Sequence, residues 1–252
     1  MRKTNFSYRV CALAVLALTA WNTPVQAAPP LAEIIEKGVA RAEQQEKQLT
    51  GWQFDQTIIA EALNSEGEPD KRQEIDMIIT VHENGPEAEI VAERGEPLIP
   101  QIGENDRQRI RQEIDANRNE LELRDKLKFY QVEYLGEGKV QERPVYILKF
   151  YPKEGIKPDN RFDKVLGNLS GRVWVDQRDY SVLQSEGKLV KPTELAWFLA
   201  KLQELEFKYS AQPIPVGWGP RWINMRFKVN LGPFKVFHRH FMTMDNFRKA
   251  AG

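Results

Sequence analysis

The sequence predicts a mainly β protein of the α+β class, in which a large curled antiparallel sheet carries a few helices. Segments that alternate apolar and polar residues recur along the chain, for example at residues 74–82 and 221–231. Turns that contain Gly or Pro separate these segments, which indicates consecutive hairpins rather than βαβ units. An amphipathic helix is expected before them, at residues 31–49. We expect roughly nine to eleven strands and two or three helices.

Residues 1–27 have the order of a secretory signal peptide. Three basic residues come first, the apolar run VCALAVLALTA follows at residues 10–20, and the small-residue stretch TPVQAAPP comes next. The apolar run is too short to span a bilayer comfortably. Val25 and Ala27 match the small-residue pattern before a cleavage site. We therefore expect an exported, periplasmic protein with one domain at residues 28–252.

The composition fits one globular domain and excludes several chemistries. The chain has 252 residues, of which 41% are hydrophobic, enough for a sizeable core. Its single cysteine, Cys11, lies in the leader, so the mature chain has no thiol nucleophile, thiolate ligand or disulfide. Without the leader, 33 basic residues face 36 acidic ones, a net charge of −3. The large basic field typical of nucleic-acid binding is absent.

The first elements follow from periodicity. Four apolar residues recur at helical spacing in the expected helix: Leu31, Ile34, Ile35 and Val39. Residues 53–63, 74–85 and 88–100 then predict three strands of a meander, separated by turns that contain Gly and Pro.

The middle of the chain is more varied. Residues 104–127 are densely charged, with few apolar positions, and predict a mostly solvent-facing helix. Residues 128–152 predict two strands across a Gly-containing turn, and residues 162–171 a short helix closed by glycine. Residues 192–205 predict a helical or looped apolar element.

Residues 171–189 predict a hairpin whose turn contains Asp176 and Asp179. Two carboxylates this close suggest a catalytic pair, but catalytic carboxylates normally come from different elements around a cleft. Asp side chains are also common in turns because they accept hydrogen bonds from nearby backbone amides. We therefore interpret the two aspartates as turn residues on an exposed tip.

Three strands are expected to end the chain, at residues 207–214, 221–231 and 233–244. The alternation at residues 221–231 is the clearest in the sequence. It places one set of residues inward: Ile223, Met225, Phe227, Val229 and Leu231.

His238 and His240 are the sharpest candidates for a metal site, because residues two apart on a strand point the same way. A zinc site needs further ligands, and only His82 remains among the histidines. We interpret the pair as polar residues on a wet strand face, and we expect no metal and no cofactor. No HExxH, GxSxG or SxxK motif and no phosphate-binding glycine loop occurs, so no catalytic residue is assigned.

Large apolar side chains in the second half of the chain are the best candidates for a binding site. They are an apolar lining for a lipid-like ligand or, alternatively, part of an ordinary core. The candidates are Trp174, Trp197, Phe198, Trp222 and Met225.

The stretch GRVWVDQRDYSVLQSEG at residues 171–187 resembles a hairpin of the outer-membrane lipoprotein-localisation (LolA/LolB-like) superfamily, which also includes RseB-type periplasmic sensors. The succession RPVYILKFYPKEG, LGNLSGRVWVDQRDY and FLAKL is similar to uncharacterised bacterial envelope members of that group. The similarity is specific over residues 143–183 and extends as strand order over residues 31–247. It implies a half-open β-barrel with helices on one side and an apolar cavity for acyl chains.

These features favour a non-enzymatic periplasmic protein that binds a hydrophobic ligand, either a lipoprotein acyl chain or a free lipid, in cell-envelope biogenesis. One alternative is an envelope interaction or sensor module with a filled barrel, whose protein partner would bind residues 105–127. Another is a metal-dependent hydrolase that uses His238 and His240. We expect no nucleic-acid partner and no stable membrane span.

We expect protein recovered from the periplasm to begin at Ala28, because the pattern before that residue is that of a cleavage site. Intact-mass measurement with N-terminal sequencing tests this. A recovered chain that still begins at Met1 would contradict the assignment of a signal peptide.

Overall fold

The computed structural model describes residues 29–98, 123–158, 161–196, 200–231 and 234–250. The chain divides into two units, residues 1–30 and 31–252, and all elements below belong to the second unit. The predicted signal peptide lies outside the described residues.

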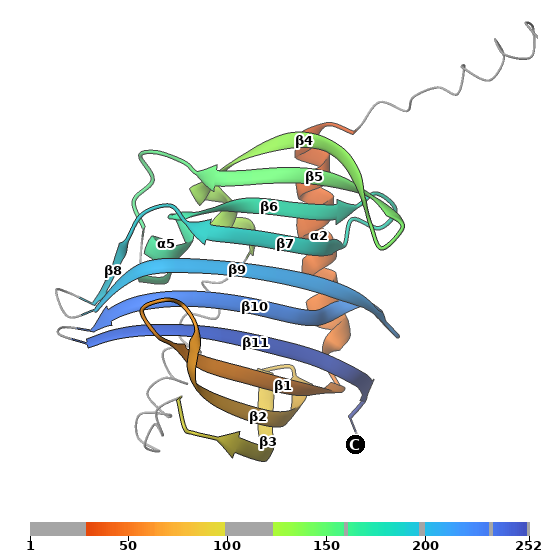
Figure 1. The fold of residues 1–252 in the computed structure, drawn as a ribbon. Helices are drawn as coiled ribbons and strands as arrows, with labels where there is room; N and C mark the ends of the chain where they lie inside the picture. Colours follow the sequence, from red (N-terminus) through yellow and green to blue (C-terminus); the bar gives the residue numbers. More distant parts are fainter. Residues whose placement is uncertain (1–28, 99–122, 159–160, 197–199, 232–233, 251–252) are drawn as a thin grey trace, which may run out of the picture. The chain divides into compact units, whose positions relative to one another are not determined.

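The second unit is built on one antiparallel sheet (Figure 1). Its strands are β1 (Trp52–Leu63), β2 (Pro69–His82), β3 (Gly85–Gly95), β4 (Tyr130–Val140), β5 (Arg143–Pro152), β6 (Leu169–Asp176), β7 (Val182–Leu189), β8 (Thr193–Ala196), β9 (Ala200–Ile214), β10 (Gly217–Leu231) and β11 (Phe234–Lys249). The helices are α2 (Leu31–Leu49), α4 (Leu123–Lys126), α5 (Arg161–Leu166) and the short 3₁₀ helix η1 (Leu127–Phe129). The prediction of a mainly β protein with an antiparallel sheet is confirmed.

The strand order is β3-β2-β1-β11-β10-β9-β7-β6-β5-β4, with β8 paired to β9. The sheet is open, because β3 and β4 lie at its two ends. Among the described strands, the pairing of β1 with β11 is the one connection between strands far apart in sequence. It runs from Trp52 opposite Lys249 to Ala62 opposite His238. This pairing joins the N-terminal meander to the rest of the sheet.

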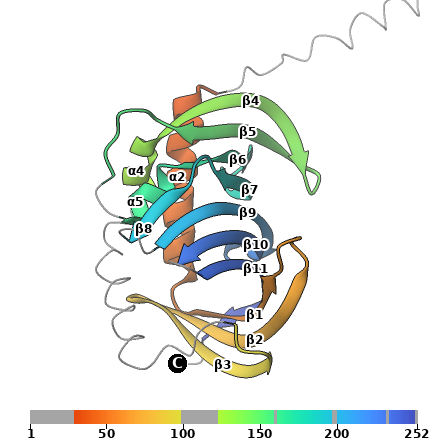
Figure 2. The same ribbon diagram turned by 60° about the vertical axis from the view of Figure 1, so that its left-hand side comes forward.

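Helix α2 crosses the strands on one side of the sheet (Figure 2). It buries Ile34 and Val39, the apolar positions expected from helical spacing. Gln45 donates a hydrogen bond of 2.7 Å from Nε2 to the carbonyl oxygen of Trp218, at the start of β10. The chain leaves the helix through Gly51, whose φ of 80° is easily reached only by glycine.

Two local predictions were wrong. The β4–β5 turn is formed by Gln141 and Glu142, both with positive φ, and not by the glycines that precede it in β4. Positive φ at both central residues is typical of a type I′ turn, which the usual Asn-Gly signal does not mark here. Residues 193–196 and 200–205 are strand rather than helix or loop, because Thr193 pairs with Leu202 and Glu194 with Lys201.

The pairing registers define two faces of the sheet, because residues directly opposite in antiparallel strands point the same way. One row across seven strands is mostly apolar and runs through Leu148, Val173, Ser185, Tyr209, Ile223, Met242 and Ile58. The neighbouring row on the other side is polar from β5 to β10, through Lys149, Arg172, Glu186, Lys208 and Asn224, and continues through Phe241 and Ile59. We call these sides the apolar face and the charged face.

A small core closes one end of the sheet, where the hairpins β4–β5, β6–β7 and β9–β10 turn. Its buried members are Val140, Val145, Leu183, Ala211 and Trp218. Ile147, Trp174 and Tyr209 are partly buried and pack against it.

Two glycines opposite each other, Gly171 and Gly187, allow β6 and β7 to lie close together on the apolar face. A Cβ atom on Gly171 would lie 1.9 Å from the carbonyl oxygen of Glu186. A Cβ atom on Gly187 would lie 2.5 Å from the ring of Phe207. No side chain fits at either position without movement of the neighbouring strand or ring.

We expect Gly171→Ala to lower the free energy of unfolding by about 3 kcal/mol, because backbone atoms must move to admit the methyl group. Gly38→Ala in α2 is the matched control. Its Cβ atom would meet only the carbonyl oxygen of Tyr180 at 3.8 Å, so we expect a gain of about 0.5 to 1 kcal/mol from helix propensity. Urea unfolding measures both, and equal stability of the two variants would contradict the packing described.

Candidate functional site

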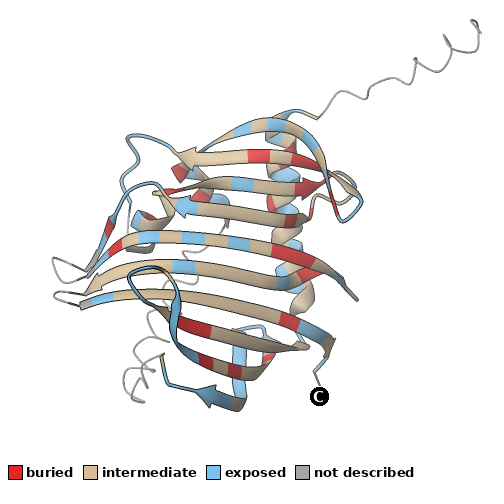
Figure 3. Ribbon diagram, in the orientation of Figure 1, coloured by how far each residue is buried: buried red, intermediate tan, exposed pale blue. Residues whose placement is uncertain are grey.

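The apolar face of β9, β10 and β11 is the candidate ligand-binding surface. Phe207 lies opposite Met225, Met225 opposite His240, and Phe227 opposite His238. All five side chains are only half-buried, and most of β10 and β11 has intermediate burial in Figure 3. This surface of Phe, Met and His is therefore partly uncovered.

Helix α2 covers the apolar face mainly at one end of these strands. Arg41 donates a hydrogen bond to the hydroxyl of Ser181, after the β6–β7 turn, and Gln45 bonds to Trp218 at the start of β10. Met225 lies further along β10, roughly 20 Å from Trp218 at the usual rise per strand residue. An α-helix is about 10 Å across, so a helix that crosses the strands near Trp218 leaves Met225 beyond its edge.

The structure separates the residues predicted to line a ligand site. Met225 lies on the apolar face. Trp222 lies on the charged face, because it is three residues from Met225 with no bulge between them. Trp174 lies on the same face as Trp222, because Trp174 is opposite Gln184, Gln184 is opposite Ser210, and Ser210 is opposite Trp222. Trp174 also packs against the small core. Trp197 and Phe198 lie outside the described residues.

The predicted set therefore does not form one wall. Trp222 instead packs beside Phe241, with ring centroids 6.3 Å apart. The prediction that Ile223, Met225, Phe227 and Val229 share one side is confirmed. The side chain that the prediction missed is Phe207, from β9, whose place beside Met225 depends on pairing between strands.

His238 and His240 lie on the apolar face beside Phe227, and not among polar side chains as interpreted from the sequence. The ring of Phe227 is 5.7 Å from that of His238 and 5.1 Å from that of His240. Burial lowers the pKa of both imidazoles, and the neighbouring His238 lowers the pKa of His240 further. Nε2 of His240 is buried without a hydrogen-bond partner among the described residues.

Within the described residues, no group of three or more His, Cys, Asp or Glu side chains is placed to hold a metal ion. The two histidines contact the ring of Phe227 on the apolar face. In the part of the chain that the structure describes, no helix combines the length and hydrophobicity needed to cross a membrane.

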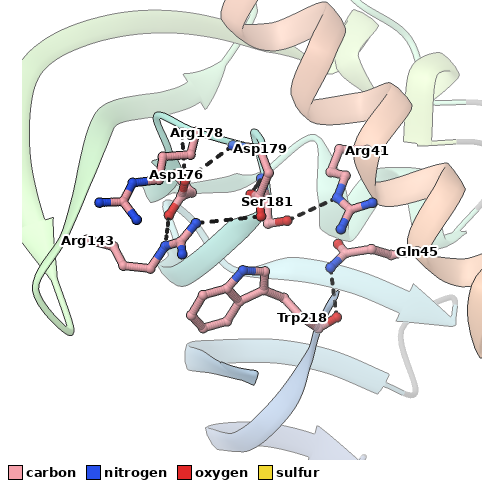
Figure 4. Close-up of polar contacts among 8 residues, drawn as sticks. All are labelled: Arg41, Gln45, Arg143, Asp176, Arg178, Asp179, Ser181 and Trp218. Carbon is pink, nitrogen blue, oxygen red and sulfur yellow. Dashed lines mark hydrogen bonds and ion pairs between the residues drawn. The ribbon is translucent and has the colours of Figure 1, made fainter. Parts of the chain in front are cut away.

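Asp176 and Asp179 form the turn of the β6–β7 hairpin, as predicted (Figure 4). Oδ1 of Asp176 accepts hydrogen bonds from the backbone N–H of Arg178 at 2.7 Å and of Asp179 at 3.3 Å. Oδ1 of Asp179 accepts one from the backbone N–H of Ser181 at 2.9 Å. Both carboxylates thus accept hydrogen bonds from backbone amides of the turn.

The prediction that Asp176 lies on an exposed tip was wrong. Its side chain is fully buried and ion-paired to Arg143. The guanidinium of Arg143 also lies over the ring of Trp218, 5.2 Å from its centroid. Burial acts to raise the pKa of Asp176, but the hydrogen bonds from Arg143 and the turn outweigh it, so the pKa lies below its ordinary value. The pair holds the hairpin turn against β5 and β10.

The charged segment at residues 105–127, the expected partner surface, lies largely outside the described residues. Its last part forms α4 and the start of η1. Arg124 of α4 lies 3.9 Å from Glu43 of α2.

No family model and no curated protein matches the sequence. The structural neighbours include a DUF1329-family protein from Desulfovibrio piger, with 12% identity, a TM-score of 0.32, and coverage of 86% of this chain and 93% of that one. A LolA-superfamily protein from Nitrosomonas europaea has 11% identity, a TM-score of 0.33, and coverage of 86% and 93%. A chain of the MucA–MucB complex of Pseudomonas aeruginosa has 9% identity, a TM-score of 0.29, and coverage of 85% and 99%.

We expect Asp176→Ala to lower the free energy of unfolding by about 3 kcal/mol, because it leaves Arg143 without its buried partner and removes two turn hydrogen bonds. Asp179→Ala should cost only about 1 kcal/mol, because that carboxylate is partly exposed. Chemical denaturation of both variants measures the difference, and equal losses would contradict a structural role specific to Asp176.

The lowered pKa of Asp176 also predicts a pH dependence. Its contribution to stability is complete above the ordinary value of 3.8 and is lost as the pH falls through the lower folded value. The stability difference between the wild-type protein and Asp176→Asn should therefore shrink below pH 3.8. A difference that stays constant there would show that the charge of Asp176 does not stabilise the fold.

Proposed function

We propose that this protein is a non-enzymatic binding protein of the bacterial cell envelope that holds a hydrophobic ligand, an acyl chain or a lipid, against the apolar face of β9, β10 and β11. The observation that carries the proposal is the row formed by Phe207, Met225 and His240 with the neighbouring Phe227. These side chains are half-buried beyond the end of the sheet that α2 covers.

The chemistry of this surface suits a flexible apolar chain. Met side chains adapt to different shapes, and the Phe rings supply large apolar area. The neutral histidines add little polarity, since burial disfavours their charged form. Burial of an acyl chain gains about 0.8 kcal/mol for each methylene group, so several methylenes suffice for binding without a polar anchor.

No described group argues for catalysis on this surface. The carboxylates of Asp176 and Asp179 accept hydrogen bonds from amides of the hairpin turn. Among the described residues, no third metal ligand lies beside His238 and His240. Export to the periplasm remains the expectation from the sequence of residues 1–27.

We expect Met225→Gln to weaken binding of a neutral monoacylglycerol about tenfold, since an amide in contact with an acyl chain loses its hydrogen bonds to water. Isothermal titration calorimetry measures the affinity. A neutral ligand is chosen so that charged groups elsewhere on the protein do not contribute.

Trp222→Gln is the matched control, because Trp222 lies on the same strand but on the charged face. It removes more apolar surface than Met225→Gln, yet we expect affinity to stay within about twofold of the wild-type value. Equal weakening by both variants, or a wild-type protein that does not bind the ligand, would sink the proposal. Thermal unfolding of both variants checks that the fold is retained.

A further inference from the structure

A cleft of about 670 Å³ lies at the end of the sheet opposite the turns that α2 contacts. Its walls come from η1, the segment after β5, α5, the loop before β8, and the start of β9. Lysines from four of these segments line it: Lys153, Lys164, Lys191 and Lys201.

The frame of the cleft is held by buried polar contacts. Lys126 and Asp163 form an ion pair of 2.8 Å, and both are buried. Asn168 donates a hydrogen bond of 2.8 Å from Nδ2 to the hydroxyl of Thr193. These contacts join α4 to α5, which carries Lys164, and join the segment after α5 to β8, which follows Lys191.

The charge around the cleft is positive, in contrast to the rest of the protein. Asp163 is neutralised by Lys126, so the four lysines are opposed by Glu154 and Glu194 alone. Within the described residues none of the four lysines makes an ion pair. The chain without its leader has a net charge of −3, so positive charge gathers here against the overall balance.

We propose that this cleft binds an anionic group, a phosphate or a carboxylate. Each lysine ammonium offers three hydrogen-bond donors and no acceptor. Four of them around a concave wall favour a ligand with several acceptor oxygens, and the local field attracts anions. A free small anion and the head group of a lipid share this chemistry.

The cleft adjoins the apolar face at Pro152. This residue lines the cleft and lies on the same side of β5 as Leu148 and Phe150. An amphiphile with its head in the cleft therefore has the apolar face next to its chain. Binding of an anion by the lysines does not require the chain, so the two sites can be tested separately.

The test combines two anionic probes with two sets of substitutions. The probes are inorganic phosphate, measured by calorimetry, and vesicles containing phosphatidylglycerol, measured by sedimentation against vesicles of phosphatidylcholine alone.

The cleft variant replaces Lys153, Lys164, Lys191 and Lys201 by Gln. The control variant replaces four exposed lysines away from the cleft by Gln: Lys47, Lys139, Lys208 and Lys249. Both variants change the net charge equally.

We expect the cleft variant to weaken binding of at least one anionic probe tenfold or more at low salt, and the control variant to weaken it less than twofold. Loss of phosphate binding identifies a site for free anions. Loss of vesicle binding alone identifies a lipid head group. Single variants Lys164→Gln and Lys191→Gln replace the fourfold variant if it melts at a lower temperature than the control.

Equal weakening by the cleft and control variants overturns the proposal, because it shows only general charge attraction. A wild-type protein that binds neither probe overturns it as well. Binding of the neutral monoacylglycerol should be unchanged in the cleft variant, so failure of the anion site is distinguishable from failure of the apolar site.

Discussion

The pairing of β1 with β11 is the constraint on which the rest of the structure depends. Strands β1 to β3 form one meander, and β4 to β11 form another. In the part of the chain that the structure describes, only this ladder joins them into one sheet. Ion pairs on the charged face stabilise the register of β1 against β11. Arg239 contacts Glu61, directly opposite it, and Arg248 contacts Asp55 at 2.7 Å. A slip of one residue would exchange the two faces of β1 and place Ile58 in water.

A sheet this wide has more apolar surface than a single helix can cover. Helix α2 buries the end near the hairpin turns, where Asp176, Arg143 and Trp218 lock the strands together. The short elements α4 and α5 form the other end, with the lysine-lined cleft. Between them lie Phe207, Met225 and Phe227, which are half-buried. Among the described residues, no Lys, Arg, Asp or Glu lies opposite them on the adjacent strands. This division, a fixed end and a partly uncovered middle, is the physical basis of the proposed ligand binding.

Local patterns predicted most of the fold because they depend on neighbours in sequence. The helix at residues 31–49 and the alternation at residues 221–231 follow from spacing alone. The grouping of Trp222 with Met225 was wrong for the opposite reason. Trp222 and Met225 look alike as large apolar residues, but the two-residue period places them on opposite faces. The burial of Asp176 was missed because its partner, Arg143, is 33 positions away, and no local signal marks that contact.

The most direct test of the central claim is native mass spectrometry of the protein as isolated from its own cells, followed by denaturation to release anything bound. Binding on the apolar face predicts a complex that is heavier than the chain and releases a species with an acyl chain. A protein that is recovered without ligand, and remains so after a neutral lipid is offered, would contradict the account and would show that the half-buried surface serves only the fold.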